Sequence, residues 1–270
     1  MEYEIRPKEK FDTGLRELWQ QRELLYFFTW RDIKVKYKQT VLGIAWAVLQ
    51  PLLLMLLFTL VFGRMLQVTT NIPYPVFAYS GLILWNIFST GITSSGNSMV
   101  SNAGIIKKIY FPRLIIPVSG VIVSLFDFLM TLPFFLAVLV WQKCLPGAQA
   151  WLSFPLGVLM ITIATIGPGC LLAALNVKYR DFRYIIPFLI QVLMFAAPVI
   201  YPVTYASSPV VRWLSALNPV SGALNVFRSG FTGCAVDYPA VLISLSSSLV
   251  LLAGGVYYFR KTESYFADLA

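Results

Sequence analysis

A single acidic residue, Asp127, interrupts a long apolar stretch in the middle of the chain. A carboxylate at the centre of a bilayer costs about 2.5–3.5 kcal/mol on insertion scales, so this side chain is expected to face protein or water. A proton relay would need further titratable groups at similar depth, and the other long apolar stretches contain no second acid. We therefore favour a structural role, or a role in the polarity of a pore, over proton transfer.

The sequence gives little support for enzymatic chemistry. It contains no histidine, and its three cysteines (Cys144, Cys170 and Cys234) form no CxxC pair. A GxxxxGK[ST] phosphate loop is also absent, so we expect no cofactor or metal in this chain and no ATP hydrolysis by it. If ATP drives its function, a separate subunit must bind the ATP and Mg²⁺. A disulfide between Cys144 and Cys234 stays open, with unpaired thiols favoured.

A mixed set of aromatic, hydroxyl and amide side chains lies between residues 75 and 95. Aromatic faces beside hydrogen-bonding groups suit sugar rings, which have apolar faces and polar edges. Ordinary helix packing also uses small hydroxyl residues, and this alternative holds for any one of them. Taken together the set favours a polar conduit, and the candidates for its lining are Trp46, Tyr79, Trp85, Asn86, Phe88, Ser89 and Asp127.

The elements that must position these residues are membrane helices. The chain is 58% hydrophobic and only 12% charged, which leaves too few polar side chains to cover a soluble fold of 270 residues. A spanning helix needs about 20 mostly apolar residues. Six windows qualify and together form a transmembrane domain over 41–259: roughly 41–62, 75–95, 114–140, 151–175, 184–205 and 239–259. No internal repeat is apparent, which disfavours an inverted-repeat transporter.

The basic residues predict the orientation of these spans. Of 21 Lys and Arg, 17 fall in the alternate segments 1–40, 96–113, 176–183 and 260–270. Positive residues favour the cytoplasmic side, so both termini are expected there, with 260–270 as a cytoplasmic tail. Because the basic residues occur in short clusters between apolar runs, the net charge of +9 does not point to nucleic acid.

The N-terminal segment 1–40 is expected to contain an amphipathic helix capped by Asp12 or Thr13. Its apolar face would hold Leu15, Leu18, Trp19, Leu25 and Tyr26. Such a helix lies in the membrane interface or packs on a partner, and the two are compatible. The following run, Arg31 to Lys38, alternates charged and apolar residues with a period of two, locally a strand pattern. We interpret it as the basic cytoplasmic lip of the first span.

The last external segment, 206–238, is too apolar for an ordinary loop and too interrupted to span. Ser208-Pro209 and Asn218-Pro219 each predict a helix start, and Gly230 predicts a stop. Two short helices with one break favour a re-entrant hairpin that dips into the outer leaflet. The alternative is two helices lying flat on the membrane surface.

Four runs together resemble the transmembrane subunits of ABC-2 type exporters, in particular permeases for O-antigen and related lipid-linked polysaccharides or teichoic acids. The runs are FFTWRDIKVKYKQTVLGIAWAVLQPLL (27–53), NAGIIKKIYFPRLIIPV (102–118), LNVKYRDFRYIIPFLIQ (175–191) and LNPVSGALNVFR (217–228). The resemblance covers nearly the whole chain from about residue 20. It implies an all-α polytopic membrane protein in the bacterial inner membrane, with six spans, an interfacial N-terminal helix and a re-entrant external pair between spans five and six.

The resemblance also implies partners and site residues. The partners would be a second copy of the chain, two copies of a cytoplasmic ABC ATPase, membrane lipids and a lipid-linked glycan. The ATPase would receive a coupling helix with Asn102, Ile105, Lys107, Lys108 and Tyr110, although the lysines could serve only to set topology. By the resemblance, Asn218, Pro219 and Arg228 would belong to the re-entrant gate. That the glycan's pyrophosphate meets Arg31, Lys34, Lys36 and Lys38 is a separate hypothesis, based on the charge of these residues.

Three other functions stay open at this point. A permease of the same type could carry teichoic acid or capsule, or it could carry a drug or a small lipid, which would need a lipid-sized cleft. A membrane enzyme acting on an isoprenoid-linked sugar would show clustered carboxylates at a membrane face, and none is visible. An ion channel would not require a coupling helix that docks in an ATPase.

Overall fold

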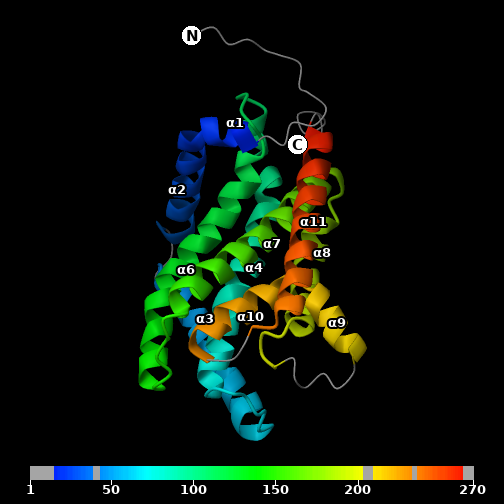
Figure 1. The fold of residues 1–270 in the computed structure, drawn as a ribbon. Coiled ribbons are helices and arrows are strands. Elements are labelled where there is room, and N and C mark those ends of the chain that lie inside the picture. The colour runs from blue at the N-terminus through cyan, green and yellow to red at the C-terminus, as the bar shows by residue number, and fades with distance from the viewer. Residues whose placement is uncertain (1–14, 39–42, 203–208, 233–235, 264–270) are drawn as a thin grey trace.

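The computed structural model describes residues 15–38, 43–202, 209–232 and 236–263 (Figure 1). Within these ranges every regular element is a helix, as the apolar composition predicts. The helices are α1 Leu15–Gln20, α2 Arg22–Lys38, α3 Ala45–Phe58, its π-helical continuation η1 Thr59–Met65, α4 Tyr74–Ser101, α5 Ala103–Ile106, α6 Ile115–Trp141, α7 Ala150–Lys178, α8 Phe182–Ala196, α9 Pro209–Leu217, α10 Pro219–Thr232 and α11 Tyr238–Thr262.

Five helices of the described chain are long and apolar enough to cross a membrane. They are α3 with η1 (21 residues), α4 (28), α6 (27), α7 (29) and α11 (25). At about 1.5 Å per residue, about 20 residues cover the roughly 30 Å hydrocarbon core. The expectation of an all-α polytopic membrane protein is confirmed.

The predicted fifth span, 184–205, has a different form from the other five. Its helix, α8, contains 15 residues and ends at Ala196. Ala197 then adopts extended backbone (φ −93°, ψ 147°), because the proline that follows it disfavours a helical conformation at this position. The predicted fifth span is therefore a shorter apolar helix followed by an irregular segment that reaches Pro202.

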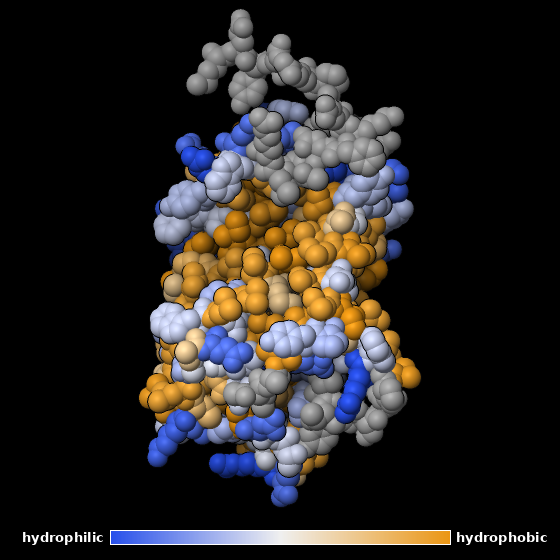
Figure 2. Space-filling view, in the orientation of Figure 1, coloured by the Kyte–Doolittle hydropathy of each residue, from blue (hydrophilic) through white to orange (hydrophobic). Residues whose placement is uncertain are grey.

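The core forms around α4, which packs against α6, α7 and α10 (Figure 1). Most of α4 is buried, whereas the outer faces of α3, α8 and α11 carry exposed leucine, valine and aromatic side chains. Figure 2 shows apolar side chains over the middle of one face, with hydrophilic residues gathered toward its two ends. This distribution suits a protein solvated by lipid around its middle.

One end of the bundle holds the first described helix, α1, and the C-terminal end of the last, α11. We call it the terminal end. Arg260 near the end of α11 forms a salt bridge of 3.0 Å with Glu17 in α1. At the same end Arg113 donates a hydrogen bond to the backbone carbonyl of Glu263. These contacts place α1, the turn before α6 and the end of α11 together. That this end is cytoplasmic stays a prediction.

The run Arg31 to Lys38 lies within α2, so the N-terminal helix extends further than the sequence pattern suggested. α2 runs beside α6 (Figure 1), and its buried residues Phe28 and Ile33 face the bundle. Trp19 and Tyr26, expected on the apolar face that meets the membrane interface or a partner, are exposed in the single chain. The proposed cap residues Asp12 and Thr13 lie outside the described residues.

At the opposite, distal end, α9 and α10 begin at the two predicted prolines, Pro209 and Pro219. α10 is buried against α4, α7 and α11, which favours the re-entrant arrangement over two helices lying flat. The predicted stop at Gly230 is wrong, since α10 continues to Thr232. Gly230 instead permits close contact with α7, because a Cβ there would lie 2.9 Å from the Cα of Ala150.

Candidate translocation path

The central helix α4 has one polar face that is accessible while its other faces are buried. The residues on this face follow one another at intervals of three or four positions and are half-buried or exposed: Asn86, Thr90, Thr93, Asn97 and Ser101. This spacing places them along one side of a helix. Over fifteen intervals of about 1.5 Å they extend about 22 Å, most of the thickness of a bilayer core. We call this face the polar stripe.

Local hydrogen bonds hold the polar stripe in order. The hydroxyls of Thr90 and Thr93 donate to carbonyls one turn earlier, at 2.5 and 2.7 Å. Asn97 donates to the Thr93 carbonyl at 3.0 Å and accepts from Asn176 of α7 at 3.1 Å. The hydroxyl oxygens keep lone pairs for a further partner, so the stripe can accept hydrogen bonds from a polar solute.

Of the candidate lining residues, Asn86 lies on the polar stripe, and Ser89 is half-buried beside it. Thr93, Asn97 and Ser101 were not among the candidates, although the same three-to-four spacing continues through them. Their signal was a hydroxyl and amide periodicity that extends beyond the predicted end of the span at residue 95.

The aromatic candidates do not share this position. Tyr79 is fully buried against Phe135, and Trp85 and Phe88 are also buried inside the protomer. Trp46 on α3 is exposed. Within a single chain the three buried rings therefore fill the core, and only the polar members of the α4 set have an accessible face.

Asp127 is almost completely buried in α6 and is paired by residues of α2. Its carboxylate forms a salt bridge with Lys36 and accepts a hydrogen bond from the hydroxyl of Tyr37. Asp127 was expected to face protein or water, and it faces protein. Its partners come from a segment about 90 positions away in the sequence. The ion pair fastens the N-terminal helix to the middle of α6.

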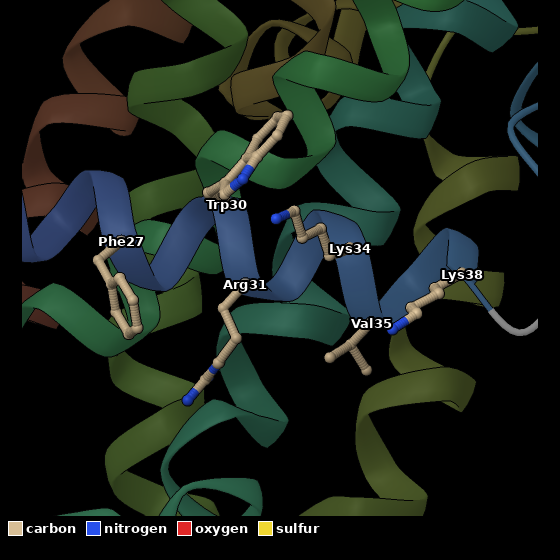
Figure 3. Close-up of a pocket in the computed structure, with 6 residues that line it drawn as sticks. All are labelled: Phe27, Trp30, Arg31, Lys34, Val35 and Lys38. Atoms are coloured by element: carbon tan, nitrogen blue, oxygen red, sulfur yellow. The ribbon is translucent and has the colours of Figure 1, made fainter.

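The four basic residues between Arg31 and Lys38 of α2 divide into two groups. Lys36 is directed to Asp127, whereas Arg31, Lys34 and Lys38 line a cavity of ≈ 480 Å³ with Phe27, Trp30 and Val35 (Figure 3). Lys34 lies 5.3 Å from the centroid of the Trp30 ring. Arg31 also donates to Asn102 at 2.7 Å, which links α2 to the end of α4. The cavity combines cationic groups with apolar aromatic faces.

The predicted coupling segment lies at the terminal end. Its only regular element is the single turn α5. Lys107, Lys108 and Tyr110 are exposed, Ile105 is half-buried, and Asn102 is held by Arg31. The segment thus presents two cations and an aromatic ring beyond the end of the bundle. Its role as a docking site stays a prediction.

At the distal end, Arg228 of α10 is buried and fastens three segments together. Its guanidinium donates to Ser80 Oγ at 3.2 Å and to the carbonyls of Pro198 at 2.8 Å, Phe77 at 3.0 Å and Val199 at 2.8 Å. The Pro198 and Val199 carbonyls lie where α8 has ended, so the guanidinium satisfies backbone groups that the break exposes. Asn218 caps α10, since its Oδ1 accepts from the Val220 backbone N–H at 3.0 Å.

The described residues contain no group of three acidic, cysteine or histidine side chains placed to hold a metal ion. Cys144 is a free thiol, and Cys234 lies outside the described residues.

A bundle of long apolar helices around a central helix with one polar face defines a polytopic α-helical membrane protein. The chain belongs to the ABC-2 type transporter family, whose profile matches residues 23–232.

Several curated relatives match over nearly their whole length. The O-antigen export system permease protein RfbA of Myxococcus xanthus is 31% identical over 257 residues, which cover 94% of this chain and 98% of that protein. The protein of the same name from Klebsiella pneumoniae is 30% identical, over 92% of this chain and 95% of its own. The polysialic acid transport protein KpsM of Escherichia coli is 25% identical, over 86% and 91% respectively.

Proposed function

We propose that this chain is the transmembrane permease subunit of an ABC exporter that moves a lipid-linked polysaccharide of the O-antigen type across the bacterial inner membrane. A separate ATPase subunit supplies the energy. The observation that carries the proposal is the polar stripe of α4, which offers uncharged hydroxyl and amide groups over about 22 Å at 1.5 Å per residue. A glycan chain presents hydroxyl groups along its whole length, and such a stripe can exchange hydrogen bonds with each successive sugar.

The stripe also supports a homodimer. In a single protomer its exposed members, Thr93 and Ser101, would face lipid. Polar groups at membrane depth are found facing a bundle interior or a water-filled cavity. A second copy related by a two-fold axis would close over the stripe and produce an aqueous path between the two protomers.

Residues of α2 support the uptake of a lipid-linked substrate. The cavity of ≈ 480 Å³ places Arg31, Lys34 and Lys38 beside Phe27 and Trp30. Cations attract a pyrophosphate, and aromatic and aliphatic faces suit the adjoining lipid. Lys36 and Arg31 do not share this role in the proposal, because Asp127 and Asp32 already neutralise them. Lys34 and Lys38 are the cations that remain for it.

Export by the complete complex is the direct test. The chain and its ABC ATPase are reconstituted in proteoliposomes, with lipid-linked glycan supplied on the ATPase side. We expect the glycan to stimulate ATP hydrolysis and to become accessible to a glycosidase on the other side. ATP hydrolysis that is indifferent to the glycan, with no glycan transferred, would contradict the proposal.

The likeness to a polysialic acid transport protein favours one second candidate, a lipid-anchored capsular polymer. An anionic glycan and a neutral one, supplied on the same lipid carrier, separate the two candidates. Preferential transfer of the anionic polymer would support the capsular substrate.

A further inference from the structure

The distal end of the bundle contains a second cavity, of ≈ 210 Å³. It shares no lining residue with the proposed uptake site. Three segments form its walls: the one leading into α4, the one following α8, and one face of α10. They contribute, among others, Thr70, Pro198, Ser221, Asn225 and Arg228. We propose that this cavity is a subsite for one neutral pyranose ring of the exported glycan. The inference rests on the proposed function, which it deepens.

Ser221 provides the first observation. Its hydroxyl oxygen is buried and has no hydrogen-bond partner, although buried polar groups in proteins are nearly always paired. Ser95 and Ser153 are also unpaired, but close helix packing accounts for them. Their hydroxyls lie 2.7 Å and 2.3 Å from the Cβ positions that Gly169 and Gly230 lack. Ser221 differs because it borders a cavity that can hold a ligand.

The face of α10 provides the second observation. Ser221, Asn225 and Ser229 are spaced four residues apart and line the same cavity, so they form a row of hydrogen-bonding groups on one side of the helix. The Ser229 hydroxyl donates to the Val226 carbonyl at 2.7 Å and keeps its lone pairs for a donor. The row can thus both accept from and donate to hydroxyl groups.

The charge and size of the cavity indicate the class of ligand. The residues that line it include no carboxylate, and its one guanidinium, on Arg228, already donates to three carbonyls and a hydroxyl. An anion would meet a cation whose donors are largely occupied. The guanidinium of Arg228 covers the Phe77 ring, 3.8 Å from its centroid, so Leu224 provides the apolar wall that suits the C–H face of a sugar. Pockets for drug-sized ligands have volumes of about 300–1,000 Å³. This cavity is smaller, at ≈ 210 Å³, and suits a single ring.

The test measures binding of simple sugars to the full chain in lipid nanodiscs, without ATPase or lipid-linked glycan. The probes are the methyl α-glycosides of glucose, galactose, mannose and rhamnose, detected by saturation-transfer difference NMR. We expect a signal from at least one glycoside, reduced about fivefold in Ser221→Ala and in Asn225→Ala, since each variant removes one hydrogen-bonding group. Ser246→Ala, which alters an exposed serine of α11, serves as the matched control and should keep the full signal.

Thermal unfolding of each variant keeps the result interpretable. Ser221→Ala removes a hydroxyl that has no partner, so its midpoint should equal that of the unaltered chain. The absence of a signal from all four glycosides, or equal signals from the unaltered chain and both variants, would overturn the subsite. Export in proteoliposomes would still decide the proposed function. Conversely, glycoside binding without glycan export would contradict the proposed function alone.

Discussion

Two charged residues inside the bundle, Asp127 and Arg228, receive partners from segments far away in the sequence. Asp127 is paired by Lys36 and Tyr37 of α2, and Arg228 is surrounded by carbonyls where α8 has ended. A charge removed from water must be paired or hydrogen-bonded, so each residue can hold its position only while those segments are assembled. Both charges therefore connect elements that apolar packing alone would leave less firmly placed.

Replacing Arg228 should weaken the distal end. Arg228→Lys retains the charge but replaces the planar guanidinium and its five N–H donors by an ammonium with three. At least one of the Pro198, Val199 and Phe77 carbonyls therefore loses its donor. We expect a loss of about 1–3 kcal/mol in the free energy of unfolding, the usual cost of leaving a buried polar group unpaired. Denaturant unfolding in mixed micelles measures it. Arg212→Lys on the exposed face of α9 is the control, and equal losses from the two variants would contradict the assignment.

The pair formed by Lys36 and Asp127 can be tested by a double-mutant cycle. Lys36→Ala leaves the carboxylate buried without a counter-charge and should cost about 1–3 kcal/mol, a value reduced by the partial exposure of the lysine. Asp127→Asn in that background should recover part of the loss, because the amide is neutral and can still accept from Tyr37. Losses that simply add would show that the two side chains do not interact.

At the scale of elements, the prolines and the apolar runs predict most of the helices. Pro209 and Pro219 mark true helix starts, because a proline at the first turn loses no hydrogen bond. The prediction failed at Gly230 and at the end of α8. A glycine that ends a helix and a glycine that admits a neighbouring helix are identical in sequence, and Gly230 is the second kind.

The polar stripe could be predicted in part, and the ion pair could not. Asn86, and Ser89 beside the stripe, were recognised by residue type. Thr93 lies within the predicted span 75–95, and following the same spacing past residue 95 would have added Asn97 as well. The partner of Asp127 was out of reach, because the 91 positions that separate it from Lys36 carry no local pattern. Three of the aromatic candidates, Tyr79, Trp85 and Phe88, are buried within the protomer. The sequence could not separate them from lining residues, because a ring that lines a conduit and a ring that fills a core have the same periodicity.

Apolar replacements on the polar stripe should slow export while the fold survives. Thr93→Leu and Ser101→Leu each remove hydrogen-bonding capacity from an exposed position. We expect about a fivefold lower rate of glycan transfer for each, corresponding to one hydrogen bond of about 1 kcal/mol. The proteoliposome assay measures the rate. Ser246→Leu on the exposed face of α11 is the control, and a rate unchanged in both stripe variants would remove α4 from the path.

The crossing of α7 and α11 depends on the absence of a side chain at Gly255. A Cβ there would lie 2.0 Å from the Gly167 carbonyl oxygen, whereas one at the adjacent Gly254 would meet nothing within 4 Å. Gly255→Ala should therefore destabilise the protein by about 1–3 kcal/mol, as overpacking usually does. Gly254→Ala should be neutral or slightly stabilising, since alanine favours a helix. Thermal unfolding of the two variants decides, and similar midpoints would contradict the close crossing.

For the whole molecule, the two ends of the bundle have different contents and suit different partners. The terminal end gathers α1, the basic α2 and the exposed segment after α5, whereas the distal end holds α9, α10 and the small cavity. Between them, the outer helices expose apolar side chains. A substrate that passes from one end to the other would meet cations first and uncharged hydrogen-bonding groups afterwards.

The exposed segment after α5 should determine attachment of the ATPase. Lys107, Lys108 and Tyr110 extend beyond the bundle, and Tyr110 is 88% exposed although its ring is large. Aromatic side chains of this kind often dominate the affinity of an interface, with losses of about 2 kcal/mol or more on truncation.

Tyr110→Ala should therefore reduce co-purification of the ATPase with the chain about tenfold or more, while membrane insertion is unchanged. Lys107→Glu should act in the same direction if the docking groove is acidic, whereas Lys261→Glu, an exposed lysine at the same end on α11, should leave the complex intact. If Tyr110→Ala retained the ATPase fully while Lys261→Glu released it, the docking surface would lie on α11 and the proposed coupling segment would be wrong.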